Sequence, residues 1–163
     1  MSQWTHMVGA IQCHWTEEEA IEKLGKPVLW NDAKKRGIKY GTPEWTDYYE
    51  NVWSAAFDKF EKGEGIPMGS EGSVDWYFSK TNDDPSCAGM GGMVAIQGDL
   101  RDFGGDWDIK KTIDWFVRAA KETRFATLTI KDEWSTKYIN VTIDHWGAVV
   151  ITTEIGDPEY ENN

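Results

Sequence analysis

Apolar and polar residues alternate along much of this chain, and the alternation predicts most of its strands. Side chains of a half-buried strand point in turn to the two faces of its sheet, which gives apolar residues a period of two. Four stretches show this period, namely Ser73–Phe78, Phe125–Lys131, Tyr138–Asp144 and Ala148–Ile155. Trp4–Cys13 and Met93–Gln97 are instead apolar on both alternating faces, which predicts two central strands that lie side by side in one sheet.

Start and stop signals place three helical segments between these strands. The predicted segments follow Thr16, Thr42 and Asp108, and they end near Gly25, Gly63 and Lys121. Thr16 and Glu19 form a capping box, in which each side chain bonds the backbone amide of the other residue. Thr42 is followed by a proline at the first helical position and by an acid in the first turn, both of which favour a helix start.

The order of the elements predicts the fold. It runs strand, helices, two strands, helix and strand, with extra strands at the C-terminal end. This order is typical of the ferredoxin-like split βαβ sandwich, an α+β fold whose antiparallel sheet carries its helices on one face. The 163 residues show no internal repeat and no break in composition, so a single domain, 1–163, is expected. Residues 156–163 are expected to form a frayed acidic tail.

The sheet face without helices is a candidate surface for a partner. If Leu128, Ile130 and Val141 face the helices, the intervening positions face away from them. Those positions are Thr127, Thr129, Tyr138, Asn140 and Thr142. A face of this composition stays solvated or takes up a partner sheet, and fold-level analogy suggests a homo-oligomer through the open sheet face.

Charge and cysteine content narrow the partners. The chain has 28 acidic and 17 basic residues, a formal net charge of -11, and this surface repels nucleic-acid backbones. A local basic pocket for a small anion stays compatible with this charge. Two cysteines, no signal-peptide pattern and no long apolar run predict a reducing cytoplasm and no membrane association.

His14 and Thr16 fit the His-x-Thr signature of two-histidine phosphoesterases. That class needs two such motifs, and neither His6 nor His145 has a threonine two positions later. The helix cap explains Thr16 without any chemistry. A phosphoesterase or other hydrolase would therefore depend on His6, His14 and the acids near Asp99.

Four aspartates crowd into ten residues and raise the question of a bound cation. They are Asp99, Asp102, Asp106 and Asp108. The segment lacks the glycine and the distal glutamate of a calcium loop, so an ordinary acidic turn is the preferred interpretation. No cofactor and no metal are predicted, although a cation at these acids is left open.

Ten tryptophans are many for this length. Four recur at positions with helix or strand periodicity and are expected in the core, namely Trp45, Trp53, Trp76 and Trp115. Four others fall in predicted loops or turns, namely Trp30, Trp107, Trp134 and Trp146. Exposed tryptophans serve as interface anchors or as stacking platforms for bases, so this second group contains candidate binding residues.

Three short motifs together resemble a family of small, uncharacterised tailed-bacteriophage proteins. The motifs are the Trp4–His6 opening of the first strand, the Pro67–Ser73 turn and the Gly98–Asp102 segment before a helix. The resemblance does not cover residues 16–63, which are therefore expected to be a helical insertion. It implies a phage product that works in the cytoplasm of a bacterial host, and it carries over no catalytic residues.

We predict a phage-encoded, non-enzymatic binding protein that inhibits or sequesters a host component, in host takeover or counter-defence. The prediction rests on the loop tryptophans, the acidic surface and the lack of an assembled catalytic set. One alternative is a sponge for a small cyclic or signalling nucleotide, with Arg36, Arg101 or Lys34 on the phosphates and a tryptophan on the base. The other alternative is the phosphoesterase or hydrolase described above.

The motifs of the resemblance also indicate where a functional surface lies. Ser70 and Glu71 enter one strand, and Asp99–Asp102 leaves the next. Consecutive antiparallel strands bring these two points to the same end of the sheet, so Arg101 is expected to reach the carboxylate of Glu71. The candidate binding residues are Ser70, Glu71, Asp99, Arg101, Asp102, Lys34, Arg36, Trp107 and Trp134.

Overall fold

A computed structural model describes residues 3–28, 33, 36–80, 91–103, 105–133 and 137–155. Six antiparallel strands form one sheet, in the order β2-β3-β1-β4-β5-β6. Their bounds are β1 Trp4–Cys13, β2 Asp75–Lys80, β3 Gly92–Arg101, β4 Phe125–Asp132, β5 Lys137–Ile143 and β6 Val149–Ile155. The α+β class and the antiparallel sheet are confirmed. The predicted adjacency of Trp4–Cys13 and Met93–Gln97 is also confirmed, because β1 pairs with β3 along its whole length.

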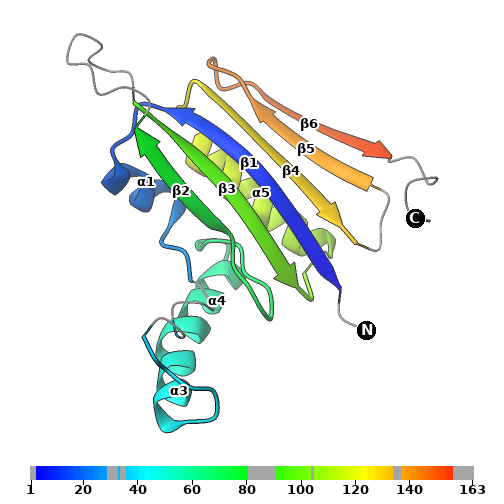
Figure 1. The fold of residues 1–163 in the computed structure, drawn as a ribbon. Coiled ribbons are helices and arrows are strands. Elements are labelled where there is room, and N and C mark those ends of the chain that lie inside the picture. Colours follow the sequence, from blue (N-terminus) through cyan, green and yellow to red (C-terminus); the bar gives the residue numbers. More distant parts are fainter. Residues whose placement is uncertain are drawn as a thin grey trace, which may run out of the picture.

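Helices α1 and α5 lie on one face of this sheet, with α5 behind the strands in Figure 1, whereas α3 and α4 extend away from it. Their bounds are α1 Glu17–Leu24, α3 Pro43–Tyr48, the π-helix η1 Tyr49–Trp53, α4 Ser54–Glu61 and α5 Asp106–Ala120. The capping box at Thr16 is formed, since its hydroxyl accepts from the Glu19 amide and the Glu19 carboxylate accepts from the Thr16 amide. The helix after Thr42 begins as predicted, with Thr42 as its cap.

The helix-facing side of the central strand β1 is buried and its other side is open, as a sheet with helices on one face requires. Met7, Ile11 and Cys13 are buried against the helices, whereas Val8 is 67% exposed on the other side. The apolar residues on both alternating faces therefore reflect a strand whose two edges are paired, with one face left open. The inward-facing residues of β4 and β5 are buried as expected, for example Leu128 and Val141.

Two buried tryptophans fix the end of α1 against the sheet and α5. The indole nitrogen of Trp76 donates to the Gly25 carbonyl at 2.8 Å, and that of Trp115 donates to the Leu24 carbonyl at 2.9 Å. The last carbonyls of a helix have no partner within it, so these bonds satisfy groups that would otherwise be buried without one. Trp53 is also buried, as predicted, while Trp45 is only half-buried.

A buried lysine connects α4 to α5. The side chain of Lys111 is 6% exposed, and its ammonium lies 3.5 Å from Glu61 of α4 and 3.6 Å from Asp108. The same ammonium lies over the rings of Phe60 and Trp107. Asp108 is thus not the helix cap that the sequence suggested. Gly105 is the N-cap residue, and Asp108 sits within the first turn, where its carboxylate faces Lys111.

The turn before β2 approaches β3 closely enough to require glycine. Gly72 has a φ of +82°, and a Cβ built on it would lie 2.2 Å from the Asp99 carbonyl oxygen. Gly69 has no room either, because its Cβ would lie 2.4 Å from the Arg101 carbonyl oxygen. Both glycines therefore allow the turn to lie directly on the backbone of β3.

Gly72→Ala is expected to lower the free energy of unfolding by more than about 2 kcal/mol, because the left-handed φ and the backbone clash add together. Gly41→Ala is the matched control, since Gly41 has a φ of +80° but a Cβ added to it would meet nothing within 4 Å. It should cost only about 1 kcal/mol. Chemical denaturation measures both values, and equal losses would show that the contact with Asp99 has no energetic weight.

Candidate functional site

The three motifs of the resemblance meet at one end of the sheet. The register of β1 and β3 places Trp4 opposite Arg101 and His6 opposite Asp99. The Pro67–Ser73 turn lies on the same end of β3. We call residues 69–72 and 99–102 the turn corner, and its side chains Ser70, Glu71, Asp99, Arg101 and Asp102 are five of the predicted binding residues.

Backbone bonds hold the turn corner together. The Ser70 amide donates to the Arg101 carbonyl at 2.9 Å, and the Arg101 amide donates to the Glu71 carbonyl at 3.0 Å. The Ser70 hydroxyl adds a bond of 2.8 Å to the carboxylate of Asp102. Asp102 has a φ of 51° and is the one described non-glycine residue in the left-handed region. Its amide donates to the Gln3 carbonyl at 2.7 Å, which ties the corner to the start of β1.

The predicted ion pair between Arg101 and Glu71 is present, with Nη1 of Arg101 donating to Oε1 of Glu71. Both side chains are partly exposed, at 35% and 48%. Ion pairs with this exposure contribute little to stability, typically below about 1 kcal/mol. The pair therefore orients two charges on the surface, and the backbone bonds supply most of the cohesion of the corner.

His6 lies beside the turn corner, between two carboxylates. Its Nδ1 is 2.6 Å from Asp99 Oδ1 of β3, and its Nε2 is 3.3 Å from Glu133 Oε1, just beyond β4. The hydrogen bond to Asp99 raises the pKa of His6 above its ordinary value, against the opposing effect of partial burial, and Glu133 raises it further. The sequence offered no signal for Glu133, because its approach depends on the pairing of β4 with β1.

The position of His6 has a chemical consequence. A histidine that acts as a general base needs one ring nitrogen free for its substrate. Here each ring nitrogen faces a carboxylate, and this arrangement suits a protonated imidazolium that donates one hydrogen bond from each nitrogen. His6 of β1 therefore links β3, through Asp99, to the end of β4, through Glu133, on the open face, and we call this link the clamp.

His14 does not join His6 in a common centre. It lies just after the other end of β1, about 26 Å away at the usual rise per strand residue. Its Nε2 accepts a bond of 2.6 Å from Nε of Arg124, and the neighbouring Thr16 caps α1. The two histidines that a hydrolase would use are therefore at opposite ends of the sheet.

The remaining predicted site residues lie elsewhere or outside the described residues. The guanidinium of Arg36 lies 6.0 Å from the ring centre of Tyr48, beside a hollow that Glu44 and Asp47 also line. Trp107 is 65% exposed on the first turn of α5, where its ring covers the ammonium of Lys111. Lys34 and Trp134 are outside the described residues, as are Trp30 and the acidic tail.

Three of the four aspartates near β3 have separate partners. Asp99 bonds His6, Asp102 accepts from Ser70, and Asp108 faces Lys111. Among the residues that the structure describes, no group of three or more histidine, cysteine, aspartate or glutamate side chains is arranged to hold a metal ion.

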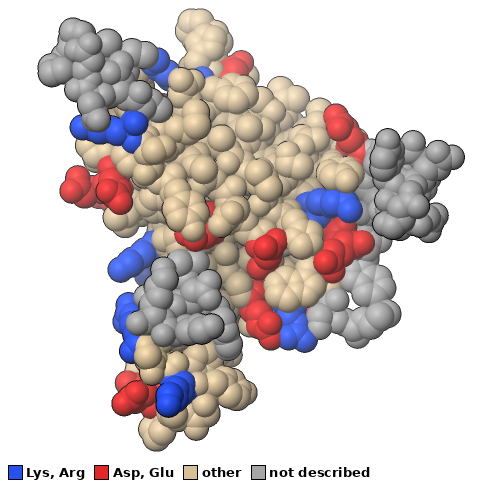
Figure 2. Space-filling model, viewed as in Figure 1, with Lys and Arg blue, Asp and Glu red and all other residues tan. Residues whose placement is uncertain are grey.

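The open face of the sheet adjoins the turn corner, and Figure 2 shows it from the front as a broad uncharged area with acidic groups toward its lower edge. Residues of several strands expose large apolar side chains there, namely Val8, Tyr77, Met93, Phe125 and Val150. The sequence analysis predicted an open face and assigned threonine, tyrosine and asparagine residues of β4 and β5 to it. It did not assign these apolar residues to that face.

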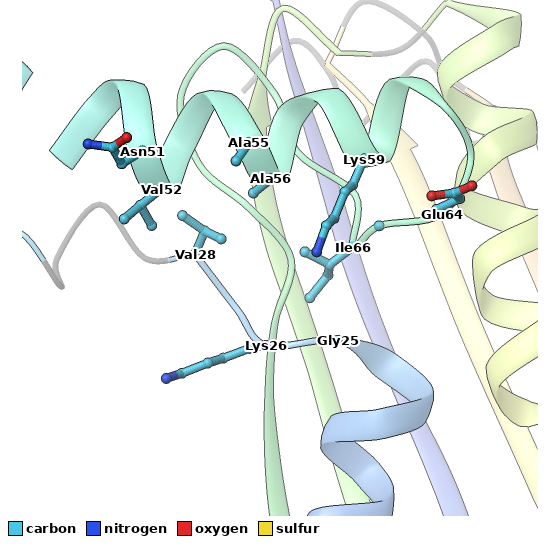
Figure 3. A pocket seen from close by; sticks show the side chains of 11 residues that line it. Gly25, Lys26, Val28, Asn51, Val52, Ala55, Ala56, Lys59, Glu64 and Ile66 are labelled. Atoms are coloured by element: carbon cyan, nitrogen blue, oxygen red, sulfur yellow. The ribbon is translucent and has the colours of Figure 1, made fainter. Parts of the chain in front are cut away.

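A hollow of about 360 Å³ lies between the η1–α4 helix and the segment after α1, and no pattern in the sequence pointed to it. Its apolar lining includes Val28, Val52 and Ile66. Figure 3 shows Lys59 pointing down from α4 beside Ile66, whereas the side chain of Lys26 extends sideways, away from Lys59. Glu64 is the acidic residue of the lining.

Comparison with known proteins adds no relative: no protein-family model, no curated protein and no solved structure matches this chain. Within the described part of the chain, no helix has both the length and the apolar character needed to cross a membrane.

The clamp at His6 predicts a pH-dependent stability. Since the folded state raises the pKa of His6, its contribution is fully present below the ordinary value of 6.5 and is lost as the pH rises through the folded pKa. The denaturation midpoint of the wild type should therefore fall across that interval. His6→Gln and Asp99→Asn should each flatten this fall, and an unchanged slope in both variants would show that the clamp does not couple protonation to folding.

Proposed function

We propose that the chain is a phage-encoded, non-enzymatic binding protein that sequesters or inhibits a component of its bacterial host. The observation that supports this most is the convergence of the three motifs of the resemblance on one exposed corner beside a broad uncharged sheet face. The carboxylates on both nitrogens of His6 favour binding over catalysis at this corner. The proposal places the protein in the host cytoplasm.

The ferredoxin-like assignment is part of the same proposal. The strand order β2-β3-β1-β4 is what a split βαβ unit requires, with α1 and α5 as its two crossover helices. The helices α3, η1 and α4 then interrupt the connection between α1 and β2, and β5 and β6 extend the sheet beyond β4. This interruption covers only the later part of the insertion predicted for residues 16–63, because α1 also falls within those residues and serves here as a crossover helix.

The partner we propose is a host protein that covers the turn corner and the adjoining open face. Val8 of β1 and Met93 of β3 supply exposed apolar area, and the paired charges of the corner supply orientation. Interfaces typically combine an apolar centre with a polar rim of this kind. Self-association through the open face stays a prediction. A second copy bound there would compete with the host partner for the same area.

A charge-swapped double variant separates binding from structure at the turn corner. Glu71→Arg combined with Arg101→Glu should keep an ion pair at this position while it reverses the charge that each strand presents. We expect a melting temperature close to that of the wild type and a loss of host-directed activity of tenfold or more, which corresponds to about 1.4 kcal/mol. Growth inhibition of host cells that express the protein is the readout.

The single variants Glu71→Ala and Arg101→Ala serve as controls. If they lower the melting temperature and the swapped variant acts like the wild type, the pair only pins the turn and the corner is not the binding surface. If all three variants keep their stability and lose activity, the proposed surface is supported.

A small anionic ligand is the second candidate function, and the hollow in Figure 3 favours it. Lys26 and Lys59 line the hollow together with apolar residues, and this combination suits a nucleotide phosphate next to an apolar or aromatic group. In this form of the nucleotide-sponge hypothesis, Lys26 and Lys59 contact the phosphates instead of Arg36, Arg101 or Lys34.

Incubation with a panel of cyclic nucleotides, followed by gel filtration and denaturation, tests this candidate. Intact nucleotide recovered from the wild type but not from the Lys26→Glu, Lys59→Glu variant would support a sponge, and chemically altered nucleotide would indicate an enzyme. Lys62→Glu is the matched control, because Lys62 caps α4 but does not line the hollow. No retention by the wild type would remove this candidate and favour the protein partner.

A further inference from the structure

The last strand of the sheet, β6, has one free edge in the described part of the chain. Among the described strands it ends the order, and β5 is its one neighbour. At the hairpin the Asp144 amide donates to the Ala148 carbonyl, and hydrogen-bonding direction alternates along an antiparallel strand. The backbone groups of Val150, Thr152 and Glu154 therefore point to β5. The backbone groups of Val149, Ile151 and Thr153 point away from β5, toward the free edge of β6.

Apolar side chains of β6 are exposed together with this edge. Val149, Val150 and Ile151 are consecutive and are 41%, 56% and 51% exposed. Val149 and Ile151 lie opposite the buried residues Ile143 and Val141, so they point to the helical side of the sheet. The helices do not extend over them, and Figure 1 shows β6 at the margin of the sheet, away from α1 and α4.

The edge carries few of the features that usually prevent strand-to-strand association. Proteins protect free edges with lysine, proline or bulges. The stretch Val149–Ile155 has no proline and no basic residue, its pairing with β5 is regular, and Glu154 is its single charge. The other edge strand, β2, differs, because Lys80 is part of it and the Asp75 carboxylate accepts from the Trp76 amide.

We propose that β6 pairs antiparallel with β6 of a second copy of this chain, about a two-fold axis at Thr152. This register uses all seven residues of the strand and sets Ile151 opposite Thr153, and Val150 opposite Glu154. The two Glu154 carboxylates then lie at opposite ends of the pair. A parallel arrangement in register would instead place them side by side, which is unfavourable for like charges.

The symmetry of this contact also sets its stoichiometry. An isologous pair occupies both β6 edges, and only the β2 edges with Asp75 and Lys80 remain at the ends of the joined sheet. Association therefore stops at a dimer with a continuous sheet of two six-stranded halves. The open face and the turn corner of each copy stay accessible, so this dimer is compatible with the proposed host partner.

Analytical ultracentrifugation of the full chain tests the dimer. We expect the wild type to be dimeric at about 100 μM, and Ile151→Lys to be monomeric there with a similar melting temperature, because a lysine on the edge opposes strand pairing. Ser79→Lys on β2 is the matched control and should remain dimeric. A monomeric wild type at that concentration, or a dimer that survives Ile151→Lys, would overturn the proposal.

Disulfide trapping tests the register independently of the dimer's affinity. Backbone groups of Thr152 point to β5, so two Thr152 residues at the axis form a non-hydrogen-bonded pair with Cα atoms about 4.5 Å apart, which suits a disulfide. Thr152→Cys in a Cys87→Ser background should form a covalent dimer under mild oxidation, and Ser79→Cys should not. Cys13 is buried and should not interfere. Equal cross-linking of both variants, or of neither, contradicts the proposed axis.

Discussion

Helices α1 and α5 cover one face of the sheet, and the register of the central strands depends on that one-sided burial. β1 is paired along both edges, so its backbone is satisfied by β3 and β4 while its side chains alternate between core and open face. A shift of its register by one residue would expose Met7 and Ile11 and turn His6 into the core. The cost of that exchange fixes the alignment of β1 with its neighbours.

The geometry of the turn corner is a consequence of that register. Because His6 is held opposite Asp99 and Trp4 opposite Arg101, the charged ends of β3 and β1 reach the same exposed place. The turn then adds its own residues through two backbone bonds to Arg101, which require the close approach that Gly69 and Gly72 allow. The backbone bonds determine the geometry of the turn corner, and the side-chain ion pairs contribute little to it.

The sequence predicted those parts of the fold that depend on local rules. Strand alternation, the cap at Thr16 and the start at Thr42 follow from the geometry of one segment, and they match the structure. The pair between Arg101 and Glu71 was also predictable, because consecutive antiparallel strands bring one entry and one exit together. This needed only the order of the elements along the chain.

Features that depend on which distant segments meet could not be predicted in the same way. Glu133 approaches His6 only because β4 pairs with β1, and Lys111 is buried only because α4 packs on α5. The exposed Val8 of β1 was not assigned to the open face for a related reason. Apolar residues on both faces of a strand do not reveal whether a second layer covers it, since two paired edges make the strand central even when one face is bare.

The charge balance at the corner connects its stability to the chemistry of a partner. Glu71, Asp99 and Asp102 lie in the corner and Glu133 lies beside it, and these four carboxylates face Arg101 and His6. When His6 loses its proton, the same carboxylates face Arg101 with less compensation. A surface with this surplus attracts basic groups, and the attraction weakens as salt screens it. The proposed host partner is therefore expected to present lysine or arginine to the corner and apolar residues to the neighbouring sheet face, which gives binding there a dependence on both pH and ionic strength.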